Sequence, residues 1–70
     1  MDSKTKFLIY CMEIYKCAEN LTDAQVLERF SRHNLFDYVI EFYEILHVHG
    51  ISYIVEDINN YISEQNKAAS

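Results

Sequence analysis

The side chains that could carry chemistry in this 70-residue sequence are two cysteines, three histidines and several paired carboxylates. Cys11 and Cys17 are six residues apart, which on one helix points their thiols about 240° apart and prevents a disulfide between them. Two free thiols are typical of a reducing compartment, and the pair lacks the C-x-x-C spacing of a metal or redox motif. We therefore interpret both cysteines as small apolar residues.

The best candidate for a metal site is the pair His47 and His49, with Glu44 about one helical turn before His47. Residues two apart on a helix face different directions, so one metal ion could bind both histidines only if the backbone were extended. We instead place these histidines at the last turn of a helix, where positive charge is favoured. We expect neither a metal nor any other cofactor.

Paired carboxylates, Glu41 with Glu44 and Glu56 with Asp57, could perform acid–base catalysis. A solvated helix face explains the same spacing. The sequence contains no nucleophile elbow, phosphate-binding glycine loop or metalloprotease motif. A chain of this size also has little room for a catalytic pocket beside its own core. We therefore expect no catalytic residues and no enzyme.

Charge is unevenly distributed along the sequence, which has a formal net charge of −5 at pH 7. Residues 1–32 hold five basic and five acidic side chains, whereas residues 33–66 hold six acidic side chains and no Lys or Arg. A DNA-recognition helix would need basic and amide residues where Asp37, Glu41 and Glu44 stand. An acidic body repels nucleic acid and attracts basic proteins. We therefore expect a protein partner with a basic surface, and no nucleic acid.

The apolar run near the start, residues 7–12, ends at Glu13. This run is shorter than the core of a signal peptide and far shorter than a membrane span of about 20 residues. The sequence therefore predicts a cytoplasmic protein that does not interact with a membrane.

Helices must position these residues, because the sequence has one Gly, no Pro and 50% hydrophobic residues. We predict one all-α domain over residues 1–70, with an ordered core of about residues 4–65. It is a compact four-helix domain with the third helix central. The first helix spans residues 3–19. The second starts at Thr22 and Gln25, which fit a capping box, and stops at Asn34, a plausible left-handed residue.

The third helix is predicted over residues 36–48, with Gly50 closing it. Its polar residues form one thin acidic stripe and the rest of its circumference is apolar. The fourth helix begins at a Ser52 cap and runs to about Asn66, with apolar residues at i, i+3, i+4 and i+7. A short strand over residues 51–58 is the alternative, because this segment is rich in β-branched residues.

Ten aromatic residues, six of them Tyr, exceed what 70 residues can bury fully. Each tyrosine could line the rim of the core or form part of an interface. We predict a protein-binding site in which acidic residues attract the partner and tyrosines make the close contacts with it. Its residues are Asp37, Tyr38, Glu41, Glu44, Tyr53, Glu56 and Asp57. The alternative is a homo-oligomeric structural protein, such as a homodimer in which helices one and three pack across a two-fold axis.

Four blocks of this sequence resemble a family of small uncharacterised bacterial proteins, domain-of-unknown-function family 3791. The blocks are residues 7–16, Phe36-Asp37-Tyr38 with Glu41-Phe42-Tyr43, Leu46-His47 before Gly50, and Tyr53-Ile54-Val55-Glu56-Asp57-Ile58. The resemblance implies a short cytoplasmic accessory protein of Firmicutes-type bacteria. It also implies a gene neighbour similar to ADP-ribosyltransferases, as in a toxin–antitoxin pair. It implies no catalytic residues.

Overall fold

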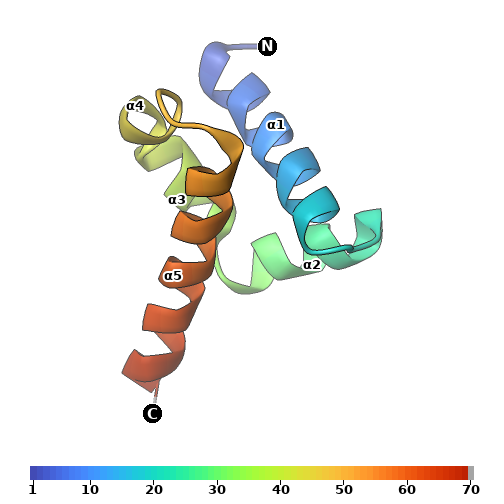
Figure 1. Ribbon diagram of the computed structural model, residues 1–70, viewed down its shortest axis with the longest axis vertical. Helices are drawn as coiled ribbons and strands as arrows, with labels where there is room; N and C mark the ends of the chain where they lie inside the picture. Colours follow the sequence, from blue (N-terminus) through green and yellow to red (C-terminus); the bar gives the residue numbers. More distant parts are fainter. Residues whose placement is uncertain (70) are drawn as a thin grey trace.

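The computed structural model is all-α and describes residues 1–69 (Figure 1). Its helices are α1 (Ser3–Ala18), α2 (Asp23–Arg32), α3 (Leu35–Glu41), α4 (Tyr43–Leu46) and α5 (Ile51–Ala69), and there is no strand among the described residues. The predicted all-α fold is therefore confirmed, and the alternative of a strand over residues 51–58 is wrong. No helix in the described part of the chain is both long and apolar enough to span a membrane.

Side-chain caps start the first two helices. The Asp2 carboxylate accepts a hydrogen bond of 2.8 Å from the Thr5 backbone N–H at the start of α1. At the start of α2, the Gln25 N–H donates to the Thr22 hydroxyl (3.1 Å) and the Thr22 N–H donates to the Gln25 side chain (2.9 Å). The predicted capping box is therefore confirmed, and it satisfies two backbone donors that the helix itself cannot use.

Two asparagines in the left-handed conformation lie in the connections that follow α1 and α2. Asn34 has φ 56°, as predicted, and Asn20 has φ 55°, which the sequence analysis missed. The predicted helix end at Gly50 is wrong. Gly50 does not have a positive φ, and α4 has already ended at Leu46. Gly50 instead accepts the first hydrogen bond of α5, from the Ile54 N–H at 3.1 Å. The predicted Ser52 cap is therefore wrong, because Ser52 lies inside the first turn of α5.

The predicted third helix is in fact two helices, because the chain turns at Phe42 (φ −100°, ψ 21°). The turn lets α4 pack against the start of α1, where the rings of Tyr43 and Phe7 meet edge to face with 5.4 Å between their centroids. It also leaves Leu46 only 1% exposed. The packing of α4 against α1 therefore accounts for the break in the helix at Phe42. No Gly or Pro in this segment indicates such a break.

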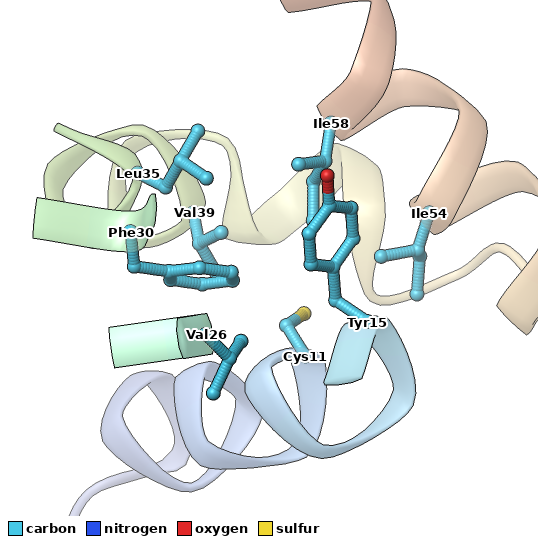
Figure 2. Close-up of a cluster of buried hydrophobic side chains, with 8 residues drawn as sticks. All are labelled: Cys11, Tyr15, Val26, Phe30, Leu35, Val39, Ile54 and Ile58. Atoms are coloured by element: carbon cyan, nitrogen blue, oxygen red, sulfur yellow. The ribbon is translucent and has the colours of Figure 1, made fainter. Parts of the chain in front are cut away.

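The core lies where α1, α2, α3 and α5 meet, and Figure 2 shows the Tyr15 ring in the middle of it. Both α1 and α3 are central: α1 packs against α2, α3 and α5, and α3 packs against α1, α2 and α4. Aromatic rings meet edge to face inside it, Tyr15 with Phe30 and Phe30 with Phe36, at 5.9 and 5.7 Å between centroids. The buried cluster comprises Cys11, Tyr15, Val26, Phe30, Leu35, Val39, Ile54 and Ile58.

Candidate protein-binding site

Three of the predicted binding residues lie together on α5. Tyr53, Glu56 and Asp57 line a shallow hollow of about 200 Å³ with Asn60. Tyr53 is 42% exposed and Glu56 is also exposed, whereas Asp57 is half-buried. These residues, together with Tyr38, are called the acidic–tyrosine surface below. Its carboxylate and phenol groups can accept hydrogen bonds from cationic side chains.

Tyr38 joins this surface from α3. Its hydroxyl donates a short hydrogen bond to the Asp57 carboxylate, and its ring stacks on Tyr61 with 3.9 Å between centroids. Burial, and then this hydrogen bond, raise the pKa of Tyr38 well above its usual value of 10.0. The Tyr38 phenol therefore stays protonated and connects α3 to α5. Glu56, which has no ion pair or hydrogen bond among the described residues, is the carboxylate available to a partner.

The structure does not bring the remaining predicted residues into the hollow. Asp37 and Glu41 are exposed and lie one turn apart on α3. Glu44 lies on α4, beyond the turn at Phe42. The acidic stripe predicted along one continuous helix is therefore divided between two helices. These carboxylates can still contribute to the long-range field, which depends on charge more than on alignment.

Intramolecular ion pairs do not neutralise these carboxylates. Lys16 pairs with Asp23 at 2.7 Å, Arg29 approaches Glu19 at 3.8 Å, and Arg32 pairs with Glu28. In these contacts, the basic side chains of α1 and α2 pair with acidic side chains from the same half of the chain. Within the described residues, Asp37, Glu41, Glu44 and Glu56 have no such pair. The second half of the molecule therefore keeps a negative field.

A polar network connects three helices and was not found from the sequence. The Tyr15 hydroxyl donates to the Asn59 side-chain oxygen (2.7 Å) and accepts from the Arg29 guanidinium (3.3 Å). The Asn59 side-chain N–H donates to the Glu19 carboxylate (3.4 Å), and Arg29 also lies over the Tyr15 ring at 5.9 Å. Since Tyr15 and Asn59 are 44 residues apart, no local pattern could indicate this contact. The network has a structural role, because it satisfies a buried phenol.

The structure places the cysteines and histidines in different local environments. Cys11 is buried in the core and Cys17 is exposed, and both are free thiols. His47 contacts the Tyr43 carbonyl through Nδ1 at 2.7 Å, whereas His49 stacks on Tyr53. No group of three or more potential metal ligands occurs in the described part of the chain.

An apolar groove of about 530 Å³ runs along α1 beside the first residue of α5. It is called the α1 groove below. Tyr10 and Ile51 on its walls are 46% and 51% exposed. The sequence predicts more aromatic surface than the fold can bury, but it does not predict this position, because the α1 groove combines residues about 40 positions apart. Its lining residues are Tyr10, Glu13, Ile14, Cys17, Ala18 and Ile51.

These features define a small all-α protein with an acidic, tyrosine-containing surface and a separate apolar groove. The family described as "Protein of unknown function (DUF3791)" matches residues 6–65, and the chain belongs to this family. The resemblance stated from the sequence is therefore confirmed. No curated protein and no solved structure matches the chain.

Proposed function

We propose that this chain is a small acidic protein-binding module that docks on a basic surface of another protein. The observation that supports it is the acidic–tyrosine surface. Glu56 and Asp57 stand beside the exposed ring of Tyr53, and residues 33–66 supply no Lys or Arg to neutralise them. Carboxylates that are not paired with a cation of the same molecule attract positively charged surfaces and speed association with them. An exposed tyrosine offers an apolar ring with a polar hydroxyl group to such an interface.

The two groups of side chains have different roles in this proposal. Glu41, Glu44 and Glu56 are exposed and raise the association rate by long-range attraction. Tyr53 makes short-range contacts that slow dissociation, as aromatic residues at interface centres do. Asp57 acts mainly inside the molecule, because its carboxylate already accepts the Tyr38 hydrogen bond.

The proposed biological setting is a bacterial toxin–antitoxin pair. In this setting the chain is the antitoxin-like accessory of a neighbouring gene product similar to ADP-ribosyltransferases, as the family resemblance implied. The proposed compartment is the cytoplasm, which is consistent with two free thiols. The partner's contact surface must then be basic, and its toxicity must fall when both proteins are expressed together.

Co-expression with the product of the adjacent gene, followed by co-purification and stopped-flow measurement of the association rate, tests this proposal. We expect a complex that weakens as salt rises, because screening reduces attraction between charged surfaces. The triple variant Glu41→Lys, Glu44→Lys, Glu56→Lys should lower the association rate by about tenfold or more. For a comparison at equal charge, the single variant Glu56→Lys is set against Glu28→Lys, which changes an exposed acid on α2 and should have the smaller effect. No complex at micromolar concentrations, or equal rates for both variants, would contradict the proposal.

Homo-oligomerisation is the second proposal, supported by large apolar side chains that stay exposed. Ile9, Tyr10, Ile45 and Val48 are 48%, 46%, 54% and 68% exposed. They lie on or near the helices expected to meet across a two-fold axis. Sedimentation equilibrium of the isolated protein tests it: a dimer at micromolar concentration would support this proposal, and a strict monomer would exclude it.

A further inference from the structure

We propose that residues 43–49, called the α4 strap below, open as a unit while the rest of the molecule stays folded, and that the closed strap covers one face of the Tyr53 ring. The strap consists of α4 and the three residues after it. The proposal rests on the proposed function in one respect, that Tyr53 belongs to a protein-binding surface. It adds a regulation of that surface, because the closed strap withholds one face of this ring from a partner.

One buried side chain anchors the α4 strap. Leu46 is 1% exposed, whereas Tyr43 is half-buried and the other five residues of the strap are exposed. Leu46 does not belong to the buried cluster that α1, α2, α3 and α5 share. The strap's other contact with α1 is the edge-to-face pair of Tyr43 with Phe7. An element with so few buried contacts is among the least stable parts of a fold.

The hydrogen bonds of the α4 strap are local. The N–H groups of Ile45 and Leu46 both donate to the Phe42 carbonyl, at 3.1 and 2.9 Å. Among the described residues, no hydrogen bond or ion pair joins residues 43–49 to α1, α2, α3 or α5. Opening of the strap therefore breaks no hydrogen bond that holds the other helices to one another.

The two residues that flank the α4 strap are suited to act as hinges. At one end the chain already turns at Phe42. At the other end stands Gly50, the only glycine in the sequence, where an added Cβ would meet nothing within 4 Å. The freedom of glycine and the open space around it let the backbone rotate at this point. Figure 1 shows α4 at the edge of the molecule, where such a movement has room.

His49 connects the α4 strap to the acidic–tyrosine surface. Its N–H donates to the Leu46 carbonyl at 3.1 Å, so its position depends on the formation of α4. Its ring stacks on Tyr53 with 3.8 Å between centroids and 21° between the ring planes. The stack covers one face of the Tyr53 ring, and the side chain is still 42% exposed. An open strap releases His49, which makes the covered face available to a cation or a ring of a partner.

Hydrogen exchange of the isolated protein, followed by NMR, tests the opening. After correction for intrinsic rates, the amides of Ile45, Leu46 and His49 should exchange at least about a hundredfold faster than those of Cys11 and Tyr15 in α1. Urea below the unfolding transition should speed exchange in α1 but not in the strap, because a local opening exposes little surface. Equal protection, or an equal response to urea, would overturn the proposal, since strap and core would then open together.

A core variant defines the boundary of the opening unit. Ile58→Val removes one methyl group from the buried cluster. It should speed exchange of the α1 amides about 2–12-fold, the effect of a typical loss on this substitution. The strap amides should keep their wild-type rate, because Ile58 stays packed when only the strap opens. An equal acceleration in the strap and in α1 would contradict a separate opening.

Nitration of Tyr53 by tetranitromethane, measured by mass spectrometry, tests the cover. The assay uses the Cys17→Ala background, because the reagent also oxidises exposed thiols. His49→Ala removes the stacked ring and should speed nitration of Tyr53 at least about twofold relative to that of Tyr10, the other largely exposed tyrosine.

Two neighbouring positions on α4 test whether the cover depends on the anchor. Leu46→Ala should speed nitration of Tyr53 as His49→Ala does, because loss of the anchor opens the strap. Ile45→Ala is the matched control: Ile45 is 54% exposed, against 1% for Leu46, so Tyr53 should react at its wild-type rate. Wild-type reactivity of Tyr53 in Leu46→Ala would overturn the proposal. A Leu46→Ala protein that does not fold, by circular dichroism, would also overturn it, because the strap would then be part of the core.

These outcomes are independent of the proposed function, because neither exchange nor nitration needs a partner. Absence of a complex with the adjacent gene product would contradict the proposed function and leave the strap results valid. Where the complex forms, His49→Ala should lower its dissociation constant about 2–12-fold, because the partner no longer competes with the stacked ring. A higher dissociation constant would overturn the role of His49 as a cover and make it a contact residue.

Discussion

At the scale of single residues, the most informative side chains are tyrosines whose hydroxyl groups are used inside the molecule. Tyr15 is fully buried and donates to Asn59, whereas Tyr38 is half-buried and donates to Asp57. A buried hydroxyl without a partner would lose its hydration without compensation. Of the six tyrosines, Tyr10 and Tyr53 are the ones left with large exposed surface. Tyr10 and Tyr53 are therefore the tyrosines with the most accessible surface.

Removal of the Tyr15 hydroxyl should lower the free energy of unfolding. Tyr15→Phe keeps the ring in the core but leaves the Asn59 oxygen and the Arg29 guanidinium without this partner. We expect a loss of about 1–2 kcal/mol, the usual effect of losing a hydrogen bond at a partly buried site. Urea denaturation followed by circular dichroism measures it. Tyr10→Phe removes an exposed hydroxyl and is the control, and an equal loss in both variants would show that the network contributes nothing.

The Cys11 thiol should make the protein less stable at alkaline pH. Burial raises the pKa of this thiol from 9.0 to about 12. Above pH 9, the unfolded chain releases the proton while the folded chain keeps it, so unfolding becomes more favourable as the pH rises. Over pH 9–12, Cys11 should steepen this decline by up to about 1.4 kcal/mol per pH unit. Urea titrations at several pH values should show a shallower slope for Cys11→Ala than for wild type or Cys17→Ala, and three equal slopes would refute it.

At the scale of the elements, local hydrogen bonds define the helix starts and long-range packing divides the third predicted helix. The capping box of α2 involves only Thr22 and Gln25, three residues apart. The turn between α3 and α4 instead depends on Tyr43 reaching Phe7, 36 positions earlier in the sequence. Where a helix begins at a local cap, substitution of the cap residue should therefore lower the stability of the protein.

Loss of the α2 cap should destabilise the protein without changing its fold. Thr22→Ala removes the hydroxyl that accepts the Gln25 N–H. The expected decrease in the free energy of unfolding is about 1 kcal/mol, within the range of about 0.5–2 kcal/mol for N-cap substitutions. Ser31→Ala, an exposed change inside α2, is the control and should alter stability by less than about 0.5 kcal/mol. Thermal unfolding measures both, and equal effects would exclude a specific role for the cap.

At the scale of the whole molecule, one small core has to hold α1, α2, α3 and α5 together. A domain of 70 residues has a stability of about 4–10 kcal/mol, so each central side chain contributes a large share. Phe30 is fully buried and contacts Tyr15 from α1 and Phe36 from α3 through edge-to-face rings. The start of α1 and the end of α5 lie at opposite ends of the long axis (Figure 1), so the core connects distant parts of the chain.

Truncation of Phe30 should bring the protein close to unfolding. Phe30→Ala removes a ring from the centre of the core and leaves a cavity, which lowers the free energy of unfolding by about 3–5 kcal/mol. Leu27→Ala, on the same helix but 54% exposed, should change it by less than about 1 kcal/mol. Denaturation by urea compares the two variants. A Phe30→Ala protein that is as stable as Leu27→Ala would show that α2 is not held by this core.

The sequence alone determined the helical class, the approximate extents of the first two helices, and the residues that begin and end the second of them. Thr22, Gln25 and Asn34 were predicted correctly because caps and left-handed stops involve residues within a few positions of each other. It also indicated Tyr53, Glu56 and Asp57, which neighbour one another on one helix. Tertiary structure alone decided the turn at Phe42 and the contact of Tyr15 with Asn59. It also decided the α1 groove, because these features join side chains that only the packed helices bring together.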